Sequence, residues 1–133
     1  AQQPLPSVDR SDETFAVVPE LTYRLGVQFT WYCAWGSFVP RVDDSYVDEI
    51  FMGLDAGAGQ IPDQSTFDDY FLLNLRVGWL SPEGKFEGAL YVNNAPDEFY
   101  YMGAAAVGDS TGAFQTTSGL PRMYGLEFRY NFF

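Results

Sequence analysis

The longest regular pattern in this chain is a two-residue alternation of apolar and other side chains. All seven odd positions from Leu21 to Cys33 are apolar, and Thr, Arg, Gly, Gln and Tyr occupy the even positions between them. Against an apolar background of 47%, seven matches from seven arise by chance in about 0.5% of cases for one register. Two is the side-chain period of a β-strand, so residues 21–33 are predicted to form a strand with one apolar and one polar face.

The alternation recurs further along the chain, and no segment of useful length shows helical periodicity. We therefore predict an all-β fold, an antiparallel up-and-down meander of about five long strands. The strands are expected near residues 21–33, 37–50, 69–80, 86–100 and 119–132. The second is the weakest, because proline cannot donate to a ladder and Pro40 is expected near a strand end or at a bulge. Residues 1–20 are polar and contain proline, which is typical of an arm or loop.

The predicted connections alternate between short and long. Residues 34–36 and 81–85 have the glycines of tight turns. Residues 51–69 and about 101–118 are long and rich in small and acidic residues. Residues 99–106 fit either an extension of the fourth strand or a hairpin, and extension is the favoured interpretation. Short and long connections in turn indicate plain turns at one end of the sheet and elaborate loops at the other.

The composition narrows the function classes. The chain of 133 residues carries 7 Lys and Arg against 18 Asp and Glu, a net charge of −11. Phosphate repels such a surface, so nucleic acid is not an expected partner. With no His and one Cys, the chain lacks a disulfide framework, a zinc site and the catalytic dyads and triads that need histidine. We expect no enzyme activity and no cofactor. The start at Ala1 is also compatible with a mature end left by signal cleavage.

Strand length and the placement of charge favour strands of the membrane-barrel type over a soluble sandwich, which would also alternate. A strand of 13 residues reaches roughly 40 Å and exceeds the 9–11 residues that a tilted transmembrane strand requires. Aromatic residues near the predicted turns resemble the girdle of a membrane barrel: Trp31, Trp35, Phe38, Trp79 and Phe86. The opposite face carries fixed charges in mid-strand: Arg24, Arg76, Glu87, Glu127 and Arg129.

Residues 94–100 resemble the Asn-Leu-Thr-Asp-x-x-Tyr signature near the C-terminus of TonB-dependent outer-membrane receptors. Asn94, Asp97 and Tyr100 match this signature, whereas Ala95 and Pro96 replace Leu and Thr. Four further segments resemble late barrel strands of that family in the same order: Val18-Pro19-Glu20, 40–43, 69–79 and 119–125. Phe132 keeps the register of the terminal aromatic residue usual in such proteins, and Phe133 is one residue more. The chain thus resembles the C-terminal β-barrel segment of such a receptor over about residues 17–132.

The resemblance implies wall strands and outer loops of a receptor for nutrient uptake, of the siderophore, cobalamin or oligosaccharide class. Such a receptor lies in the outer membrane of a Gram-negative bacterium. Its barrel has about 22 strands, and five strands cannot close. The open edges require the remaining barrel strands and plug of a receptor, or identical copies pairing edge to edge. Membrane lipid would contact the apolar face in a barrel.

Two alternatives stay open beside the barrel segment. Identical sheets joined head to tail would close into a ring or grow as a filament, which gives a self-assembling extracellular fibre or tube. A soluble all-β ligand-binding domain is the third hypothesis.

An acidic cluster is the only candidate for a metal site. Asp43, Asp44, Asp48 and Glu49 lie at a strand-to-loop junction, and Asp63, Asp68 and Asp69 lie across the same loop. Oxygen ligands of this kind suit Ca²⁺. No EF-hand spacing is present, so a solvated acidic rim is the favoured interpretation.

Other candidate sites have simpler interpretations. Glu87 and Glu127 are expected to form a ladder of opposite charges with Arg76 and Arg129, rather than a catalytic carboxylate pair. Cys33 is expected to be a small hydrophobic residue on the apolar face. Residues 57–59 are interpreted as a flexible loop rather than a phosphate-binding loop.

Overall fold

The structure is a computed structural model that describes residues 17–51, 66–106 and 114–132. Within these ranges the regular elements are ten β-strands. They are β1 (Thr22–Gln28), β2 (Trp31–Cys33), β3 (Gly36–Val47), β4 (Ile50–Phe51), β5 (Thr66–Phe67), β6 (Tyr70–Leu80), β7 (Phe86–Asn93), β8 (Tyr101–Ala106), β9 (Phe114–Ser118) and β10 (Met123–Tyr130). Among the described residues, no helix offers an apolar span that is long enough to cross a membrane.

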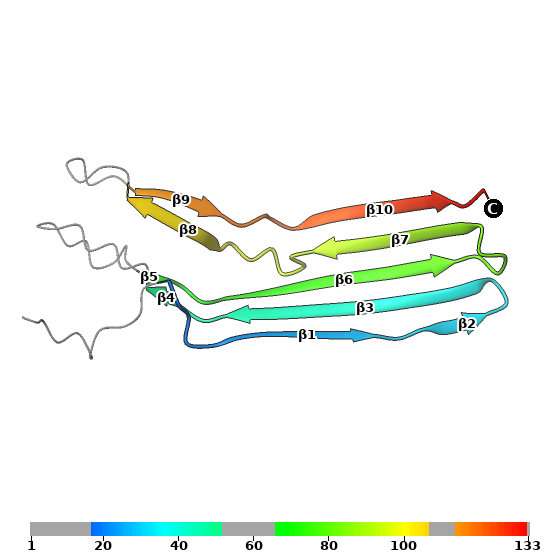
Figure 1. The fold of residues 1–133 in the computed structure, drawn as a ribbon, viewed down its shortest axis with the longest axis horizontal. Coiled ribbons are helices and arrows are strands. Elements are labelled where there is room, and N and C mark those ends of the chain that lie inside the picture. The colour runs from blue at the N-terminus through cyan, green and yellow to red at the C-terminus, as the bar shows by residue number, and fades with distance from the viewer. Residues whose placement is uncertain (1–16, 52–65, 107–113, 133) are drawn as a thin grey trace, which may run out of the picture.

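The main sheet is an open antiparallel meander with the order β1-β3-β6-β7-β10, and β2 continues beside β3. Two small two-stranded sheets, β4–β5 and β8–β9, lie together at one end, which we call the loop end (Figure 1). The β2–β3 and β6–β7 turns and the last described residues lie at the other end, which we call the turn end (Figure 1). The expected fold class, an all-β antiparallel meander that is not a closed barrel, is confirmed.

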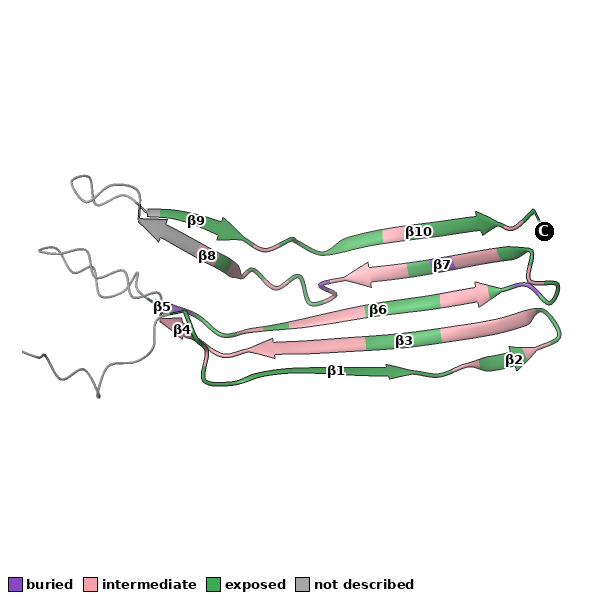
Figure 2. Cartoon of the chain, in the orientation of Figure 1, coloured by how far each residue is buried: buried purple, intermediate pink, exposed green. Residues whose placement is uncertain are grey.

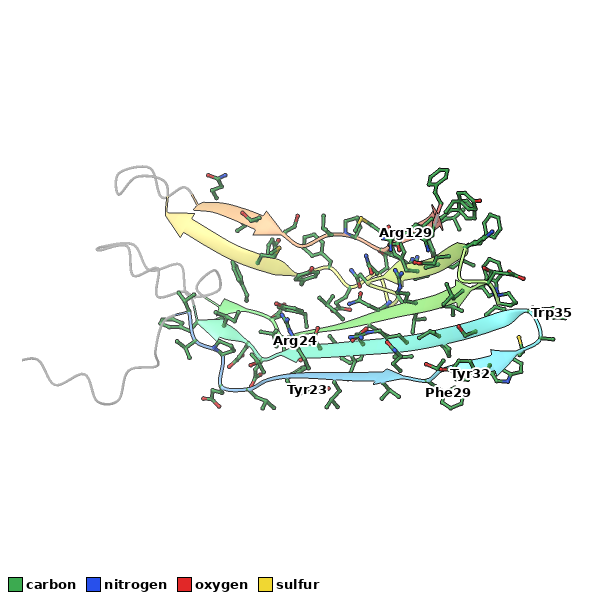
Figure 3. All side chains as sticks on the ribbon, turned by 45° about the vertical axis from the view of Figure 1, so that its right-hand side comes forward. Tyr23, Arg24, Phe29, Tyr32, Trp35 and Arg129 are labelled. Atoms are coloured by element: carbon green, nitrogen blue, oxygen red, sulfur yellow. The ribbon has the colours of Figure 1, made fainter. Side chains whose placement is uncertain are left out.

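The strand register separates two faces of the main sheet, because residues directly opposite each other in antiparallel strands share a face. The apolar face carries a row that crosses all five strands: Val27, Val42, Leu75, Val92 and Tyr124. The polar face carries the neighbouring row: Gln28, Arg41, Arg76, Tyr91 and Gly125. Figure 3 shows Tyr23 and Phe29 on one side of the edge strand and Arg24 on the other. The apolar and polar residues that alternate in the sequence therefore lie on opposite faces of the sheet.

The described residues form almost no hydrophobic core. Ala89 in the main sheet and Phe67 in β5 are the buried hydrophobic residues among them. Large apolar side chains stay exposed along both outer strands, as for Val27 (71%) and Leu126 (76%), and Figure 2 shows β1 and β10 mostly exposed. An apolar face of this extent marks a contact surface for lipid or protein.

The fourth predicted strand, residues 86–100, is wrong in its second half. β7 ends at Asn93, and β8 pairs with β9 in a separate hairpin. The chain leaves the strand direction because Asn94 and Asp97 have φ values of 51° and 64°, and such left-handed backbone does not continue a strand. The hairpin alternative for residues 99–106 is therefore the correct one. Residues 119–122 precede β10 instead of opening it.

The first predicted strand is divided into β1 and β2, and the cause lies in the facing strand. Pro40 sits inside β3 rather than near its end. The Phe29 amide donates to the Pro40 carbonyl at 3.1 Å, but proline has no N–H to return the bond. One of the two backbone hydrogen bonds between Phe29 and Pro40 is therefore missing, and the edge strand is interrupted at residues 29 and 30.

Candidate functional site

Ion pairs connect the strands across the polar face. Arg76 on β6 donates to Glu127 on β10 at 2.9 Å, and Arg129 on β10 donates to Glu87 on β7 at 3.3 Å. These contacts confirm the expected ladder of opposite charges. Asn131 strengthens it, because its side-chain amide donates to Glu87 Oε1 at 2.9 Å and to the Gly84 carbonyl at 3.1 Å.

Small residues leave room on the polar face between these charges. A hollow of about 720 Å³ lies beside Arg76, Glu87, Glu127 and Arg129, over Gly78 and Ala89. On the same face, the Tyr91 ring covers Gly125 so closely that a Cβ there would lie 2.0 Å from the ring. The polar face thus presents a charged, hollowed surface, whereas the apolar face presents side chains without charge along most of its length.

We expect the Arg76–Glu127 pair to stabilise the sheet only weakly, because both side chains are about half exposed (44% and 55%). In a double-mutant cycle with Arg76→Gln and Glu127→Gln, the coupling should change the unfolding equilibrium constant by about fivefold or less. It should vanish near 1 M salt, where the screening length falls to about 3 Å. A coupling unchanged by salt would contradict an exposed ion pair.

The four acidic candidates for a cation site do not come together. Asp43 lies on the polar face and forms a 2.6 Å bidentate pair with Arg41. Asp44 lies on the apolar face, opposite Leu25 on one side and Leu73 on the other. Asp48 accepts the backbone N–H of Glu49 at 2.9 Å and, at 3.4 Å, the Tyr46 hydroxyl. No group of three or more ligating residues occurs in the described ranges, and Asp63 lies outside them.

Asn94 organises the turn that follows β7. Its side chain is 5% exposed, and its amide nitrogen donates to the carbonyls of Glu98 (2.8 Å) and Leu120 (3.1 Å). Its amide oxygen accepts the Glu98 backbone N–H at 2.9 Å. The Asn94 backbone N–H donates to Asn74 Oδ1 at 3.0 Å. One buried residue therefore joins the turn to β6 through its backbone N–H and to the segment that leads into β10 through its side-chain amide.

Asp97 and Tyr100, the other two signature positions, hold the same two segments together. Asp97 accepts the Arg122 backbone N–H at 2.9 Å and pairs with its guanidinium at 3.4 Å. Tyr100 stacks on Tyr70 with 4.5 Å between ring centroids. It also covers Gly119, where a Cβ would lie 1.9 Å from the ring. These contacts indicate that Asn94, Asp97 and Tyr100 stabilise the turn and its attachment to neighbouring segments. The sequence did not reveal their partners, because only the register brings residues 119–122 beside the turn.

Aromatic residues form rows at both ends of the apolar face. At the turn end, Trp31 packs on Phe38 (6.3 Å) and Phe86 on Tyr130 (5.0 Å). At the loop end, Tyr23 stacks on Tyr46 at 5.6 Å, a row that the sequence analysis missed. Tyr23 and Trp31, which mark the two rows on β1 and β2, are eight positions apart. This corresponds to about 27 Å of strand, or about 20 Å of height at the tilt of membrane barrels. This is close to the roughly 25 Å apolar band of outer-membrane barrels.

The remaining candidates are placed as follows. Phe132 is 82% exposed and lies edge-on to Tyr130 at 4.8 Å. Cys33 is a free, half-buried thiol opposite Gly36. Phe133, residues 57–59 and most of the N-terminal arm lie outside the described residues.

Comparison with known proteins shows the fold. No family model matches the sequence, and no curated protein matches it. Among solved structures, the chain is similar to the ferric yersiniabactin uptake receptor FyuA from Yersinia pestis, with a TM-score of 0.70, 22% identity and 87% of this chain covered. This neighbour is a TonB-dependent receptor, which confirms the expected resemblance at the level of fold. The chain spans 17% of the length of that receptor.

Proposed function

We propose that this chain forms wall strands of the C-terminal β-barrel portion of a TonB-dependent receptor, in the outer membrane of a Gram-negative bacterium. The observation that supports this most strongly is the exposed apolar face between two aromatic rows, on a sheet whose fold matches part of such a receptor. Lipid is the environment in which such a face is stable, because water cannot solvate it without cost.

The two faces then have different tasks. The apolar face contacts lipid, and the ion-paired polar face lines the barrel interior, where the plug of the receptor lies. The turn end carries short connections, as the periplasmic end of an outer-membrane barrel does. The segments 51–69 and 101–118 start at the loop end and act as outer-face loops that contact ligand.

The receptor takes up a scarce nutrient and carries out no catalysis. Siderophore, cobalamin and oligosaccharide are the candidate classes, and the siderophore class is favoured because the solved neighbour is a ferric yersiniabactin uptake receptor. Substrate contacts are assigned to the outer-face loops and the plug.

Extraction of cell envelopes tests the location. An antiserum against this chain should detect, in the outer-membrane fraction, a polypeptide much larger than 14.9 kDa that only detergent releases. A band of 14.9 kDa that elutes as a monomer without detergent would instead indicate a soluble domain.

Labelling tests which face meets lipid. With Cys33→Ala as the background, a fluorophore on Val27→Cys should be quenched by lipids that carry a spin label in the acyl chain. The same fluorophore on the adjacent position, Gln28→Cys, should be quenched at least about threefold less, because it lies on the opposite face. Equal quenching at both positions would contradict a lipid-facing apolar face.

A self-assembling extracellular fibre or tube is the second candidate function. The bare outer edges of β1 and β10 favour it, since neither edge has a pairing strand within the described residues. This candidate predicts material that pellets as fibres from plain buffer.

A further inference from the structure

The two outermost strands of the main sheet run in the same direction. Four antiparallel steps separate β1 from β10, and both arrows point toward the turn end in Figure 1. Copies joined head to tail would therefore place β10 parallel to β1 of the next copy, which is the less stable type of pairing. A two-fold axis would instead place β10 antiparallel to β10 of a second copy. The head-to-tail arrangement expected from the sequence is thus the less favourable one.

The backbone of β10 shows which groups are free to pair. Asn131, directly after β10, donates its backbone N–H to the carbonyl of Lys85, directly before β7, at 2.8 Å. By the alternation of antiparallel pairs, the odd-numbered residues of β10 therefore direct their N–H and C=O groups to β7. The even-numbered residues direct theirs to the outer edge, which has no pairing strand among the described residues. They are Tyr124, Leu126, Phe128 and Tyr130. Only registers that set even residues opposite even residues use these groups.

Three registers near the middle of β10 set even residues opposite even residues, with the two-fold axis at Leu126, Glu127 or Phe128. In the register centred on Phe128, Glu127 lies opposite Arg129 of the second copy, twice by symmetry. In the register centred on Glu127, this residue lies opposite its own copy, and in the register centred on Leu126 it lies opposite the uncharged Gly125. Opposite charges directly across a strand pair stabilise it and like charges destabilise it, so the register centred on Phe128 is favoured.

Both charges are available for this contact. Glu127 and Arg129 bind Arg76 and Glu87, yet their side chains remain 55% and 73% exposed. A second copy would extend each existing pair into a row of four alternating charges. On the other face, Phe128 meets its own copy, and Leu126 meets Tyr130.

We infer that this 133-residue chain, outside a closed barrel, pairs with a second copy through the β10 edge in the register centred on Phe128. The β1 edge does not offer the same complementarity, because Arg24 is its one charged residue. The dimer leaves the turn ends of the two copies pointing in opposite directions. It is therefore a property of the free chain and does not depend on the proposed place in a receptor.

Disulfide trapping tests this inference. In the Cys33→Ala background, refolded in detergent micelles, Phe128→Cys should link more than half of the chains on mild oxidation. Residues opposite each other in a hydrogen-bonded pair lie about 5.5 Å apart, within disulfide reach. Leu126→Cys is the matched control, because it leaves both charges in place. It should link under a tenth, since its copy lies four residues along the partner strand, about 14 Å away.

Each other outcome overturns the inference. Preferential linking of Leu126→Cys would establish the register centred on Leu126, and equal linking would indicate the register centred on Glu127 or random collision. If Phe128→Cys fails to fold, sedimentation of the unmodified chain decides, since a monomer in micelles would refute the dimer. The extraction experiment above addresses the receptor separately, because a closed barrel covers this edge.

Discussion

Replacing Gly36 by alanine is expected to destabilise the sheet by about 4 kcal/mol. Gly36 follows the β2–β3 turn with a φ of 118°, a region that side chains with a Cβ rarely adopt. An added Cβ would lie 1.9 Å from the carbonyl oxygen of Leu80. That oxygen belongs to the backbone of β6, so relief requires the two strands to move apart.

The free energy of unfolding in urea, followed by tryptophan fluorescence in micelles, measures this effect. Trp79 is a suitable reporter because its indole N–H donates to the Trp35 carbonyl at 2.9 Å, in the same turn. Gly84→Ala is the matched control: its φ of 70° is also positive, but nothing lies within 4 Å of its added Cβ. The control should cost about 1–2 kcal/mol. Equal losses would show that the close approach of β3 and β6 does not matter.

Replacing Asn94 by alanine is expected to cost about 3 kcal/mol. The change removes three side-chain hydrogen bonds inside a nearly buried turn. The N–H of Glu98 and the carbonyls of Glu98 and Leu120 would lose this partner, and an unsatisfied buried group costs about 1–3 kcal/mol. We also expect faster proteolysis between β7 and β10, because the turn then loses its attachment to residue 120.

Neighbouring substitutions separate the causes. Asn93→Ala is the control, since no side-chain hydrogen bond of Asn93 occurs among the described residues, and it should cost under about 1 kcal/mol. Asn94→Gly removes the strain of the positive φ of 51°. It should still show most of the stability loss expected for Asn94→Ala, because it lacks the amide. A fully stable Asn94→Gly variant would show that the turn depends on backbone conformation and not on the amide.

The sequence predicted the strands best where alternation is uninterrupted. Residues 69–80 became β6 almost unchanged, because a two-residue period needs no knowledge of the neighbouring strand. The break in the first strand was not predictable in this way. Its cause is Pro40 on the facing strand, and only the pairing register places that proline opposite Phe29.

The site was predicted in part. Alternation alone indicated that Arg76, Glu87, Glu127 and Arg129 share a face, and their pairing followed. Resemblance identified Asn94, Asp97 and Tyr100, but it carried no information on what they hold. Arg122, the partner of Asp97, lies 25 residues beyond it, a separation that the hairpin of β8 and β9 bridges. Asp43 and Asp44 of the acidic cluster do not converge, because adjacent residues of a strand point to opposite sides.

The position of Asp44 limits how deep the strands of the proposed barrel wall can lie in the membrane. Its carboxylate lies between Leu25 and Leu73, one row inside the Tyr23–Tyr46 stack. Charged groups are tolerated on the lipid side near the headgroups and become costly toward the bilayer midplane. If the wall moved toward the turn-end side of the membrane, this carboxylate would enter the hydrocarbon. If the wall moved toward the loop-end side, Trp31 would leave the headgroups at the turn end. A single acid and a tryptophan thus set upper and lower limits on the vertical position of the strands.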